Sequence, residues 1–300
     1  MIEVTNITKS FEDITALDNV TATIQEGQVF GLIGTNGAGK STFLRILCGV
    51  LKPDAGNVKI DGQEIYENEQ LKQNIFYISD SQHFFNGSTP KEMRDFYANI
   101  YENYDKAKFD DLLKKFGLDE NRRISTFSKG MKKQLSVILG ISAGTKYLLC
   151  DETFDGLDPV MRQAVKSLFA AEIEDKGMTP IIASHNLREL EDICDHVGLL
   201  HKGGILFSKD LDDLKCNIHK IQGVFTSEEA AKAFIEKMHP VKIDTRGSLY
   251  TMTVNGSLDE VEAAINEADT VFAEILPLSL EEIFISETEI RGYDIRNLIL

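Results

Sequence analysis

The chain has 300 residues, 42% apolar and 27% charged, which fits a globular protein of one large domain or two smaller ones. Its net charge of −16 disfavours general nucleic-acid binding, because an acidic surface repels phosphate backbones. No apolar run reaches the ~18–20 residues of a membrane helix, and "MIEVTNITKS" lacks a signal-peptide layout, so we expect a cytoplasmic protein. The cysteines show no CxxC spacing, so we expect reduced, mostly buried thiols rather than a metal site or disulfides.

The first motif is a glycine-rich loop between a strand and a helix. "GQVFGLI" predicts a short strand and "FLRILCGVL" a helix, and between them "GTNGAGKST" (34–42) fits G-x-x-x-x-G-K-[ST]. Glycines let backbone N–H groups turn inward around phosphate oxygens, and the helix start adds its positive dipole end. An ordinary glycine turn is the alternative, but the strand–loop–helix order favours a phosphate loop, our name for residues 34–42.

The side chains of the phosphate loop indicate a nucleotide with its metal ion. Lys40 can reach the β- and γ-phosphates, and the Ser41 hydroxyl can ligate Mg²⁺. We therefore expect ATP and Mg²⁺ as ligands. The loop residues expected to contact the nucleotide are Gly34, Thr35, Asn36, Gly37, Ala38, Gly39, Lys40, Ser41 and Thr42.

The middle of the chain is mostly helical in pattern. In 81–145, "TPKEMRDFYANIY" predicts a helix with Pro90 at its first position, and "KFDDLLKKFG" predicts a helix that ends at Gly117. A third helix is predicted by "MKKQLSVILGISAG". From 146 to 206, strands alternate with helices, as in a parallel sheet, so the expected fold class is α/β.

Acidic residues follow a strand of the predicted sheet. "YLLCD" reads as a buried parallel strand that ends in Asp151, and ligands sit at such strand ends. We expect Asp151 to be a metal ligand and Glu152 to be the general base for an attacking water. A solvated acidic loop is the alternative, and the phosphate loop favours the metal and its nucleotide. Asp155 and Asp192 are expected to be solvated charges.

Residues 217–300 predict a small second domain. Strands are predicted at "IHKIQGVF", "VKID", "SLYTMTV" and "VFAEILPL", and capping boxes at Thr226–Glu229 and Ser257–Glu260 begin two helices. This β-α-β-β-α-β order predicts a ferredoxin-like α+β domain, followed by a helix at "SLEEIFISETEI" and an apolar tail, "GYDIRNLIL". We expect a regulatory, dimerising or docking module, and the alternative is an appendage that only adds stability.

In their order, these motifs resemble the nucleotide-binding subunit of ATP-binding cassette (ABC) transporters, over about residues 2–215. "FSKGMKKQ" (127–134) looks like the family signature LSGGQ, and "GLDP" (156–159) looks like the loop that crosses the dimer interface. "IIASH" ends in His185, which matches the family's switch histidine, and "PDAGNVKIDG" matches the run after the first helix. The resemblance implies a P-loop NTPase cassette with a helical subdomain.

The resemblance also implies roles for individual residues. In the family, the signature segment of one subunit closes over the γ-phosphate held by the other, which implies Ser128 and Gly130 as ligands in trans and Asp158 at the interface. It implies that Phe11 stacks on adenine and that His185 contacts the γ-phosphate. The alternatives are a core position for Phe11, a satisfied strand-end histidine, and a simple capped helix start at 127–134.

Three departures from the family pattern concern the same site. Lys129 replaces a signature glycine and Met131 replaces the glutamine, and Thr153 stands where a proline usually follows the glutamate. "IFYISDSQ" (75–82) normally ends in a glutamine that touches Mg²⁺ and relays to the membrane partner. The matching residue here is Asp80, and a carboxylate can also ligate Mg²⁺, so we expect Asp80 to join Ser41 and Asp151 as a metal ligand.

These inferences predict an ABC cassette over 1–215, with a helical subdomain at about 81–145, and an accessory domain over 217–300. The expected function is ATP hydrolysis, with Lys40, Glu152 and His185 as catalytic residues, to power a transporter of the exporter type. Expected partners are a transmembrane permease on a separate chain and a second ABC subunit, identical or different, but no nucleic acid. The chain would then lie on the cytoplasmic face of the membrane.

Two other functions remain open at this point. One is a soluble ABC-type ATPase that works on ribosomes or DNA, although such proteins usually carry two cassettes, long coiled coils or zinc insertions. The other is a module that senses ATP without turnover, against which the presence of both Glu152 and His185 argues. The transported substrate cannot be inferred from these motifs.

Overall fold

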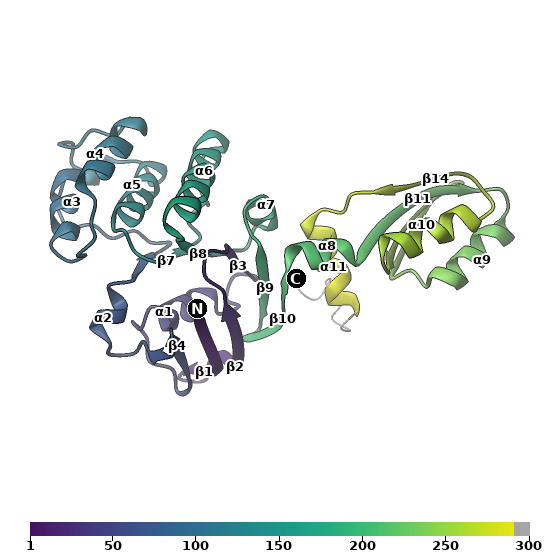
Figure 1. Cartoon of the computed structure of the whole chain (residues 1–300), viewed down its shortest axis with the longest axis horizontal. Coiled ribbons are helices and arrows are strands. Elements are labelled where there is room, and N and C mark those ends of the chain that lie inside the picture. Colours follow the sequence, from purple (N-terminus) through teal and green to yellow (C-terminus); the bar gives the residue numbers. More distant parts are fainter. Residues whose placement is uncertain (291–300) are drawn as a thin grey trace. The chain divides into compact units, whose positions relative to one another are not determined.

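The structure, a computed structural model, describes residues 1–290, with side chains described up to Ser286. The chain divides into two compact units at the Ser208–Lys209 bond. The first unit has two sheets with helices around them, and the second has one sheet with its own helices (Figure 1). The apolar tail noted in the sequence, residues 292–300, lies outside the described residues. None of the helices within residues 1–290 is long and apolar enough to cross a membrane.

The first unit contains a six-stranded sheet in the order β10-β9-β3-β8-β7-β6. The neighbours from β9 to β6 pair in parallel, as predicted from the alternation of strands and helices. Its strands are β3 (Phe30–Ile33), β6 (Ile75–Ile78), β7 (Tyr147–Asp151), β8 (Thr179–Ser184), β9 (His196–His201) and β10 (Gly204–Asp210). Because parallel strands run in one direction, the segments that follow β3, β6, β7 and β8 emerge at the same edge.

A second, four-stranded sheet has the order β2-β1-β4-β5 and is antiparallel. Its strands are β1 (Ile2–Phe11), β2 (Ile14–Ile24), β4 (Ala55–Ile60) and β5 (Gln63–Glu64). The helix α1 (Lys40–Leu47) contacts β2 of this sheet and also β7 and β8 of the parallel sheet. Its buried Phe43, Leu44 and Leu47 belong to a core cluster that includes side chains of both sheets. The core therefore fixes the start of α1, where the phosphate loop ends.

Three helices in the 90–142 segment lie side by side: α3 (Pro90–Ala98), α4 (Lys106–Lys115) and α5 (Lys129–Ser142) (Figure 1). Pro90 is the first residue of α3, as predicted, and Thr89 and Glu92 form a capping box at the same helix start. The α4 helix ends just before Gly117, close to the predicted end, and Gly117 has a left-handed conformation with φ +67°. The other helices of this unit are α2 (Glu69–Lys72), η1 (Ile124–Thr126), α6 (Pro159–Lys176) and α7 (Leu187–Glu191).

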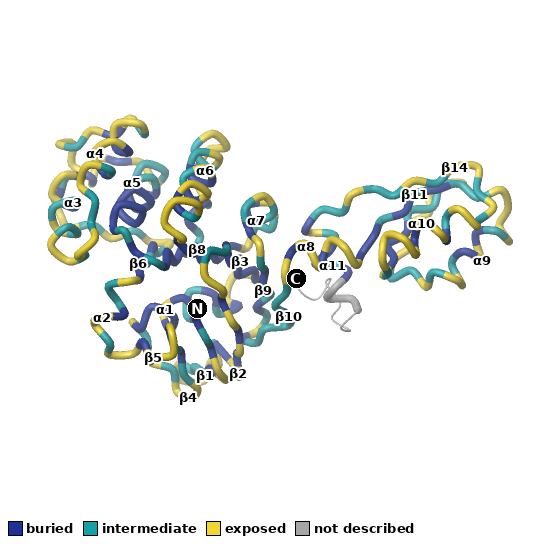
Figure 2. The backbone as a smooth tube through the Cα atoms, in the orientation of Figure 1, coloured by how far each residue is buried: buried dark blue, intermediate teal, exposed yellow. Residues whose placement is uncertain are grey.

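The α5 helix is seated directly on the parallel sheet. Every residue of β7 and β8 is buried, and so is the second half of α5 (Figure 2). A Cβ at Gly140 would lie 2.8 Å from the Leu148 Cδ1 atom and 3.1 Å from the Phe76 ring. The absence of a side chain at Gly140 therefore lets the end of α5 approach β6 and β7 closely.

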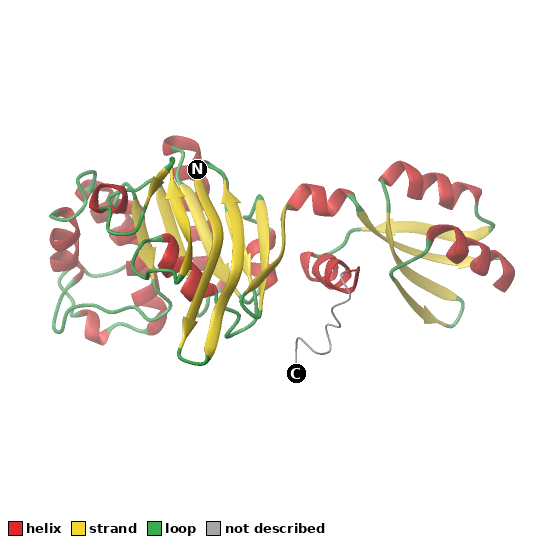
Figure 3. Cartoon of the chain, turned by 90° about the horizontal axis from the view of Figure 1, so that it is seen from below, coloured by secondary structure: helices red, strands yellow, loops and turns green. Residues whose placement is uncertain are grey.

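The second unit contains its own sheet and helices (Figure 3). Its four strands form an antiparallel sheet in the order β12-β13-β11-β14. With two helices on one face, whose side chains share a core with β11 and β13, this is the predicted ferredoxin-like arrangement. Its elements are α8 (Leu211–Cys216), β11 (Ile218–Phe225), α9 (Glu228–Met238), β12 (Lys242–Arg246), β13 (Leu249–Asn255), α10 (Leu258–Glu267), β14 (Thr270–Leu276) and α11 (Leu280–Ile290).

One of the two predicted capping boxes in this unit is confirmed and the other is wrong by one residue. Ser257 and Glu260 form the predicted box at α10. At α9 the cap is Ser227, whose hydroxyl accepts a hydrogen bond from the Ala230 N–H at 3.1 Å. The Thr226 hydroxyl instead donates a hydrogen bond to the carbonyl oxygen of Asp269 at 3.2 Å, so it does not cap α9.

Candidate functional site

The phosphate loop joins β3 to α1 and lies against two other strands. A Cβ at Gly34 would lie 2.5 Å from the carbonyl oxygen of Leu200, and a Cβ at Gly39 would lie 2.3 Å from that of Ala16. Gly39 caps α1 with φ +106°, a conformation that side chains disfavour. Only glycine fits at these two positions, and the middle of the loop, residues 35–37, stays exposed. The loop therefore presents backbone N–H groups and a helix start to the outside, as an anion site requires.

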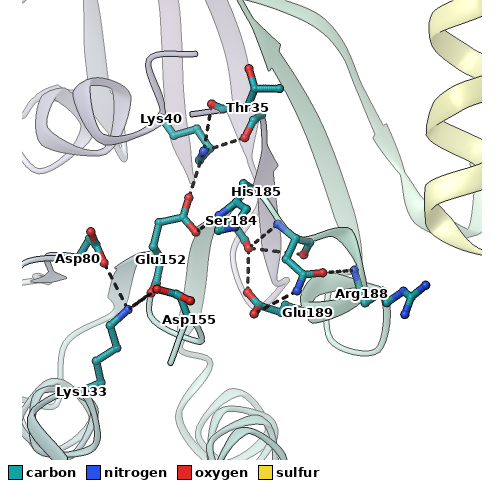
Figure 4. Close-up of polar contacts among 12 residues, drawn as sticks. Thr35, Lys40, Asp80, Lys133, Glu152, Asp155, Ser184, His185, Arg188 and Glu189 are labelled. Carbon is teal, nitrogen blue, oxygen red and sulfur yellow. Dashed lines mark hydrogen bonds and ion pairs between the residues drawn. The ribbon is translucent and has the colours of Figure 1, made fainter. Parts of the chain in front are cut away.

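The side chain of Lys40 is nearly buried beneath this loop, with 6% of its surface exposed. Its Nζ atom donates to the carbonyl oxygens of Gly34 at 2.7 Å and Thr35 at 3.3 Å. It also lies 3.1 Å from the Oε1 atom of Glu152 (Figure 4). The loop thus folds around a fixed positive charge, and a carboxylate is its nearest negative partner.

Glu152 follows β7 and His185 follows β8, so adjacent parallel strands bring the two residues together. The Oε2 atom of Glu152 lies 2.8 Å from the His185 Nδ1 atom. The backbone of Glu152 has φ +48°, which is uncommon for a residue with a side chain and is a form of strain found at functional sites. The predicted catalytic residues Lys40, Glu152 and His185 therefore form one connected group (Figure 4).

Asp151 is the last residue of β7, and its carboxylate is buried. Its Oδ2 atom accepts a hydrogen bond from the Tyr77 hydroxyl at 2.9 Å. Burial raises the pKa of Asp151, and the neighbouring hydroxyls of Ser41 and Tyr77 oppose that rise. Burial also raises the pKa of Tyr77 to about 12, so its hydroxyl stays a donor at neutral pH.

The residues around Asp151 fit a magnesium ion. Within the described residues, the Oδ1 atom of Asp151 is buried and has no hydrogen-bond partner. A buried polar atom of this kind calls for a ligand, and carboxylate and hydroxyl oxygens are ligands that Mg²⁺ takes. No group of three or more His, Cys, Asp or Glu residues gathers into a metal site in the described part of the chain. A cation beside Asp151 and Ser41 would therefore depend on phosphate oxygens as well, as P-loop sites do.

Other residues predicted to contact the nucleotide lie on the surface of this chain. Phe11, at the end of β1, is 46% exposed, which rules out a core position, and the Lys9 Nζ atom lies 5.5 Å from its ring centroid. The hydroxyl of Ser128 caps α5 by accepting from the Met131 N–H at 3.2 Å. Asp158 caps α6 by accepting from the Met161 N–H at 2.9 Å. Within the described residues, no hydrogen bond or ion pair joins either cap to the group around Lys40.

The structure adds charged contacts that the motifs did not indicate. The Oδ1 atom of Asp80, two residues after β6, lies 3.3 Å from the Nζ atom of Lys133 on α5. Asp155 is partly exposed, as expected of a solvated charge, and its Oδ2 atom also lies 3.1 Å from the Nζ atom of the exposed Lys129. That ion pair lowers the pKa of Asp155. Asp192 is 75% exposed but also pairs with a lysine, Lys166, at 3.3 Å.

Known proteins share this arrangement. The family model for ABC transporters matches residues 17–155. The ABC transporter ATP-binding protein YtrB of Bacillus subtilis (strain 168) is 32% identical over 96% of this chain and 98% of its own length. The bacitracin transport ATP-binding protein BcrA of Bacillus licheniformis is 28% identical over 80% of this chain and 79% of its own. The lantibiotic transport ATP-binding protein SrtF of Streptococcus pyogenes is 32% identical over 71% of this chain and 92% of its own.

Solved structures resemble the chain over a shorter length. An ATP-binding subunit of an ABC transporter is 27% identical, with a TM-score of 0.66, over 72% of this chain and 92% of its own. A dimeric ATP-binding cassette in a post-hydrolysis state, bound to ADP and Pi, is 21% identical, with a TM-score of 0.64, over 70% of this chain and 99% of its own. At 21% identity, the similarity to the dimeric cassette shows a shared fold only.

The chain therefore belongs to the ATP-binding proteins of ABC transporters, ATPases that couple ATP hydrolysis to transport. The predicted family, fold class and ATPase activity are confirmed. The similarity to YtrB spans 287 residues, so it continues well into the second unit, which begins at Lys209. The solved structures cover only 70–72% of the chain, so this comparison of sequences reaches further than the comparison of structures.

Proposed function

We propose that this chain is the ATP-hydrolysing subunit of an ABC exporter and acts on a transmembrane permease carried by a separate chain. The observation that supports the hydrolytic role best is the position of Glu152, whose carboxylate lies between Lys40 at 3.1 Å and His185 at 2.8 Å. A carboxylate fixed at both oxygens beside a phosphate loop is arranged to take a proton from water. A module that only senses ATP has no use for such an arrangement.

Each catalytic residue has a distinct role in this proposal. Lys40 neutralises charge on the β- and γ-phosphates, Glu152 takes a proton from the attacking water, and His185 orients Glu152 and contacts the γ-phosphate. The phosphate loop supplies backbone N–H groups from Gly34, Thr35, Asn36, Gly37, Ala38, Gly39, Lys40, Ser41 and Thr42. All of these residues come from segments at one edge of the parallel sheet.

Mg²⁺ belongs to the same proposal. Bound with the nucleotide, it would neutralise charge that develops on the phosphate oxygens. Ser41 and Asp151 would hold it, because the buried Asp151 Oδ1 atom has no other partner in the described chain. Asp80 is the third proposed ligand, and in that role its carboxylate would share the ion pair with Lys133.

A second cassette completes the site in this proposal. Ser128 and Gly130 at the start of α5 would contact the nucleotide of the partner cassette, Asp158 would lie at the interface, and Phe11 would stack on adenine. The exposure of the Phe11 ring and of the caps Ser128 and Asp158 supports these roles, since residues that work between chains have to be accessible in one chain alone. Residues 1–215 would then be the cassette, and 217–300 a docking or dimerising module.

Transport is the function of the relatives by name. BcrA is named for bacitracin transport and SrtF for lantibiotic transport, and these names support the proposal of an exporter. The single cassette with a linked second unit also resembles exporter-type subunits more than importer-type ones. In this proposal the chain lies on the cytoplasmic face of the membrane and is held there by its permease.

Purification of the tagged full-length chain from its own cells in mild detergent tests the proposal. We expect a multispan membrane protein to be retained, together with Mg²⁺-dependent ATP hydrolysis. Retention of ribosomes or DNA without a membrane protein would support the soluble ATPase instead. Tight ATP binding without any turnover, in the complex and in the isolated chain, would support the sensing module.

A further inference from the structure

Lys133 is a buried charge that none of the roles above uses. Its side chain is 0% exposed, although it belongs to the first half of α5. A buried ammonium group is costly unless its surroundings pair it and satisfy its hydrogen bonds. Its Nζ atom donates to the carbonyl oxygen of Glu152, lies 3.3 Å from the Asp80 Oδ1 atom and lies 4.0 Å from the Asp155 Oδ2 atom (Figure 4).

The contact with Glu152 acts on a strained backbone. Glu152 has φ +48°, and its N–H donates to the Ala183 carbonyl at 2.9 Å. Its own carbonyl accepts from the Asp155 N–H at 3.3 Å and from Lys133. Because φ sets the direction in which the side chain leaves the backbone, the groups that hold this turn also aim the carboxylate at Lys40 and His185.

The contact with Asp80 gives Lys133 its counter-ion. The Asp80 side chain is 48% exposed, so the ion pair reaches from the interior to the surface at the segment that follows β6. One ammonium group thereby joins three parts of the cassette: α5, the segment after β6 and the turn after β7. The resemblance described in the sequence analysis places Asp80 where the family usually has a glutamine, and here the carboxylate pairs with Lys133.

We propose that Lys133 is a positioning residue for ATP hydrolysis, which holds the Glu152 carbonyl so that the Glu152 carboxylate stays aimed into the site, with Asp80 as the counter-ion that keeps Lys133 in place. This inference rests on the proposed role of Glu152 as general base. It assigns Lys133 no contact with nucleotide, so it predicts an effect on turnover and not on binding.

The test is Lys133→Met, which keeps the length of the side chain and removes its charge and donors. We expect kcat to fall by about tenfold to a hundredfold, because small misplacements of a catalytic group cost that much, while KM and the Kd for ATP change by less than about threefold.

The chain offers a matched control. Lys166 on α6 is also buried and also pairs with an exposed aspartate, Asp192, at 3.3 Å, but it lies outside the group around Glu152. Lys166→Met and Asp192→Asn therefore remove an equivalent ion pair, and we expect kcat to stay within about twofold of the wild-type value. Thermal unfolding of all variants separates a loss of folded protein from a loss of turnover.

Wild-type kcat in folded Lys133→Met overturns the proposal, and so does an equal loss of kcat in Lys166→Met. If Lys133→Met does not fold, Lys133→Gln carries the same comparison of kcat with KM. Glu152→Gln separates the two proposals. Wild-type turnover in Glu152→Gln would contradict the role of Glu152 as general base. If Glu152→Gln loses turnover but Lys133→Met keeps the wild-type kcat, only the positioning role of Lys133 is contradicted.

Discussion

The Nδ1 atom of His185 lies 2.8 Å from the Oε2 atom of Glu152, although the two residues are 33 positions apart in the chain. They meet because each follows one of two adjacent parallel strands, with Asp151 paired in register with Ala183. Lys40 lies 3.1 Å from the other carboxylate oxygen. The carboxylate of Glu152 is therefore oriented at both of its oxygens by residues from two other segments.

Glu152→Gln should abolish phosphate release while leaving ATP binding intact. The amide keeps the shape of the side chain and can still contact His185 and Lys40, but it cannot take a proton from water. We expect kcat to fall by at least about a hundredfold. Phosphate release is the measurement, with ATP titration and dimer mass alongside, and a trapped ATP-bound dimer is expected. Turnover at the wild-type rate would contradict the role of Glu152 as base.

Lys40→Ala should weaken nucleotide binding, the step that precedes hydrolysis. The substitution removes the cation that lies beneath the phosphate loop, where it donates to the carbonyl oxygens of Gly34 and Thr35. We expect ATP affinity to fall by at least about tenfold, measured by titration with a fluorescent nucleotide. Lys114→Ala, an exposed lysine on α4, is the control and should bind as the wild type does. If Lys40→Ala and Lys114→Ala bound ATP with equal affinity, the phosphates would not bind at the phosphate loop.

Phe11→Ala should weaken ATP binding without changing stability. The ring is 46% exposed, so its removal leaves no core cavity, but stacking on a base contributes about 1 kcal/mol or more, roughly fivefold in Kd. Ile14→Ala is the matched control, because Ile14 pairs with Phe11 across the β1–β2 hairpin and is 71% exposed. An equal loss of ATP affinity in Phe11→Ala and Ile14→Ala would mean that the β1–β2 hairpin, and not stacking by the Phe11 ring, affects binding.

Removal of the second unit should leave nucleotide binding unchanged. The cut is best placed after Asp210, at the end of β10, because Leu211 and Leu214 of α8 are buried and α8 contacts β11. We expect the shortened chain to bind ATP with wild-type affinity and to dimerise or bind its permease less well, as measured by sedimentation over a concentration series. A folded fragment that lost ATP binding would place a nucleotide ligand in the second unit.

Much of the fold could be predicted from local patterns, because these patterns depend on neighbouring residues. "YLLCD" is buried at all five positions of β7, as an all-apolar run bounded by charge indicates. Pro90, Gly117 and Ser257 each mark a helix end through their own backbone or hydroxyl, so they could be placed without knowledge of the rest of the chain. The motif residues Lys40, Glu152 and His185 lie in contact with one another, because parallel strands bring the segments that follow them to one edge of the sheet.

The remaining features depend on residues distant in sequence. Thr226 and Ser227 are equal candidates for a cap by residue type, and the choice is made by the carbonyl oxygen of Asp269, which accepts from Thr226. A lysine at position 133 reads as a solvated charge, since its counter-ion Asp80 is 53 residues away. One signal was present, however: Lys133 lies three, four and seven residues before the buried Ser136, Val137 and Gly140, a spacing that puts all of them on one face of α5.

Gly140 lets α5 approach β6 and β7 closely, so a rigid tilt of the helix about this contact would move each residue in proportion to its distance from it. With a rise of about 1.5 Å per residue, Lys133 lies about 10 Å along the helix from Gly140, and Ser128 lies about 18 Å from it. A tilt of about 10° would therefore move Ser128 by about 3 Å and Lys133 by about 2 Å. The smaller displacement already exceeds the tolerance of a hydrogen bond, so it would release the carbonyl of Glu152. A tilt of this one helix would therefore change both the position of Ser128 at its exposed start and the direction of the carboxylate proposed to activate water.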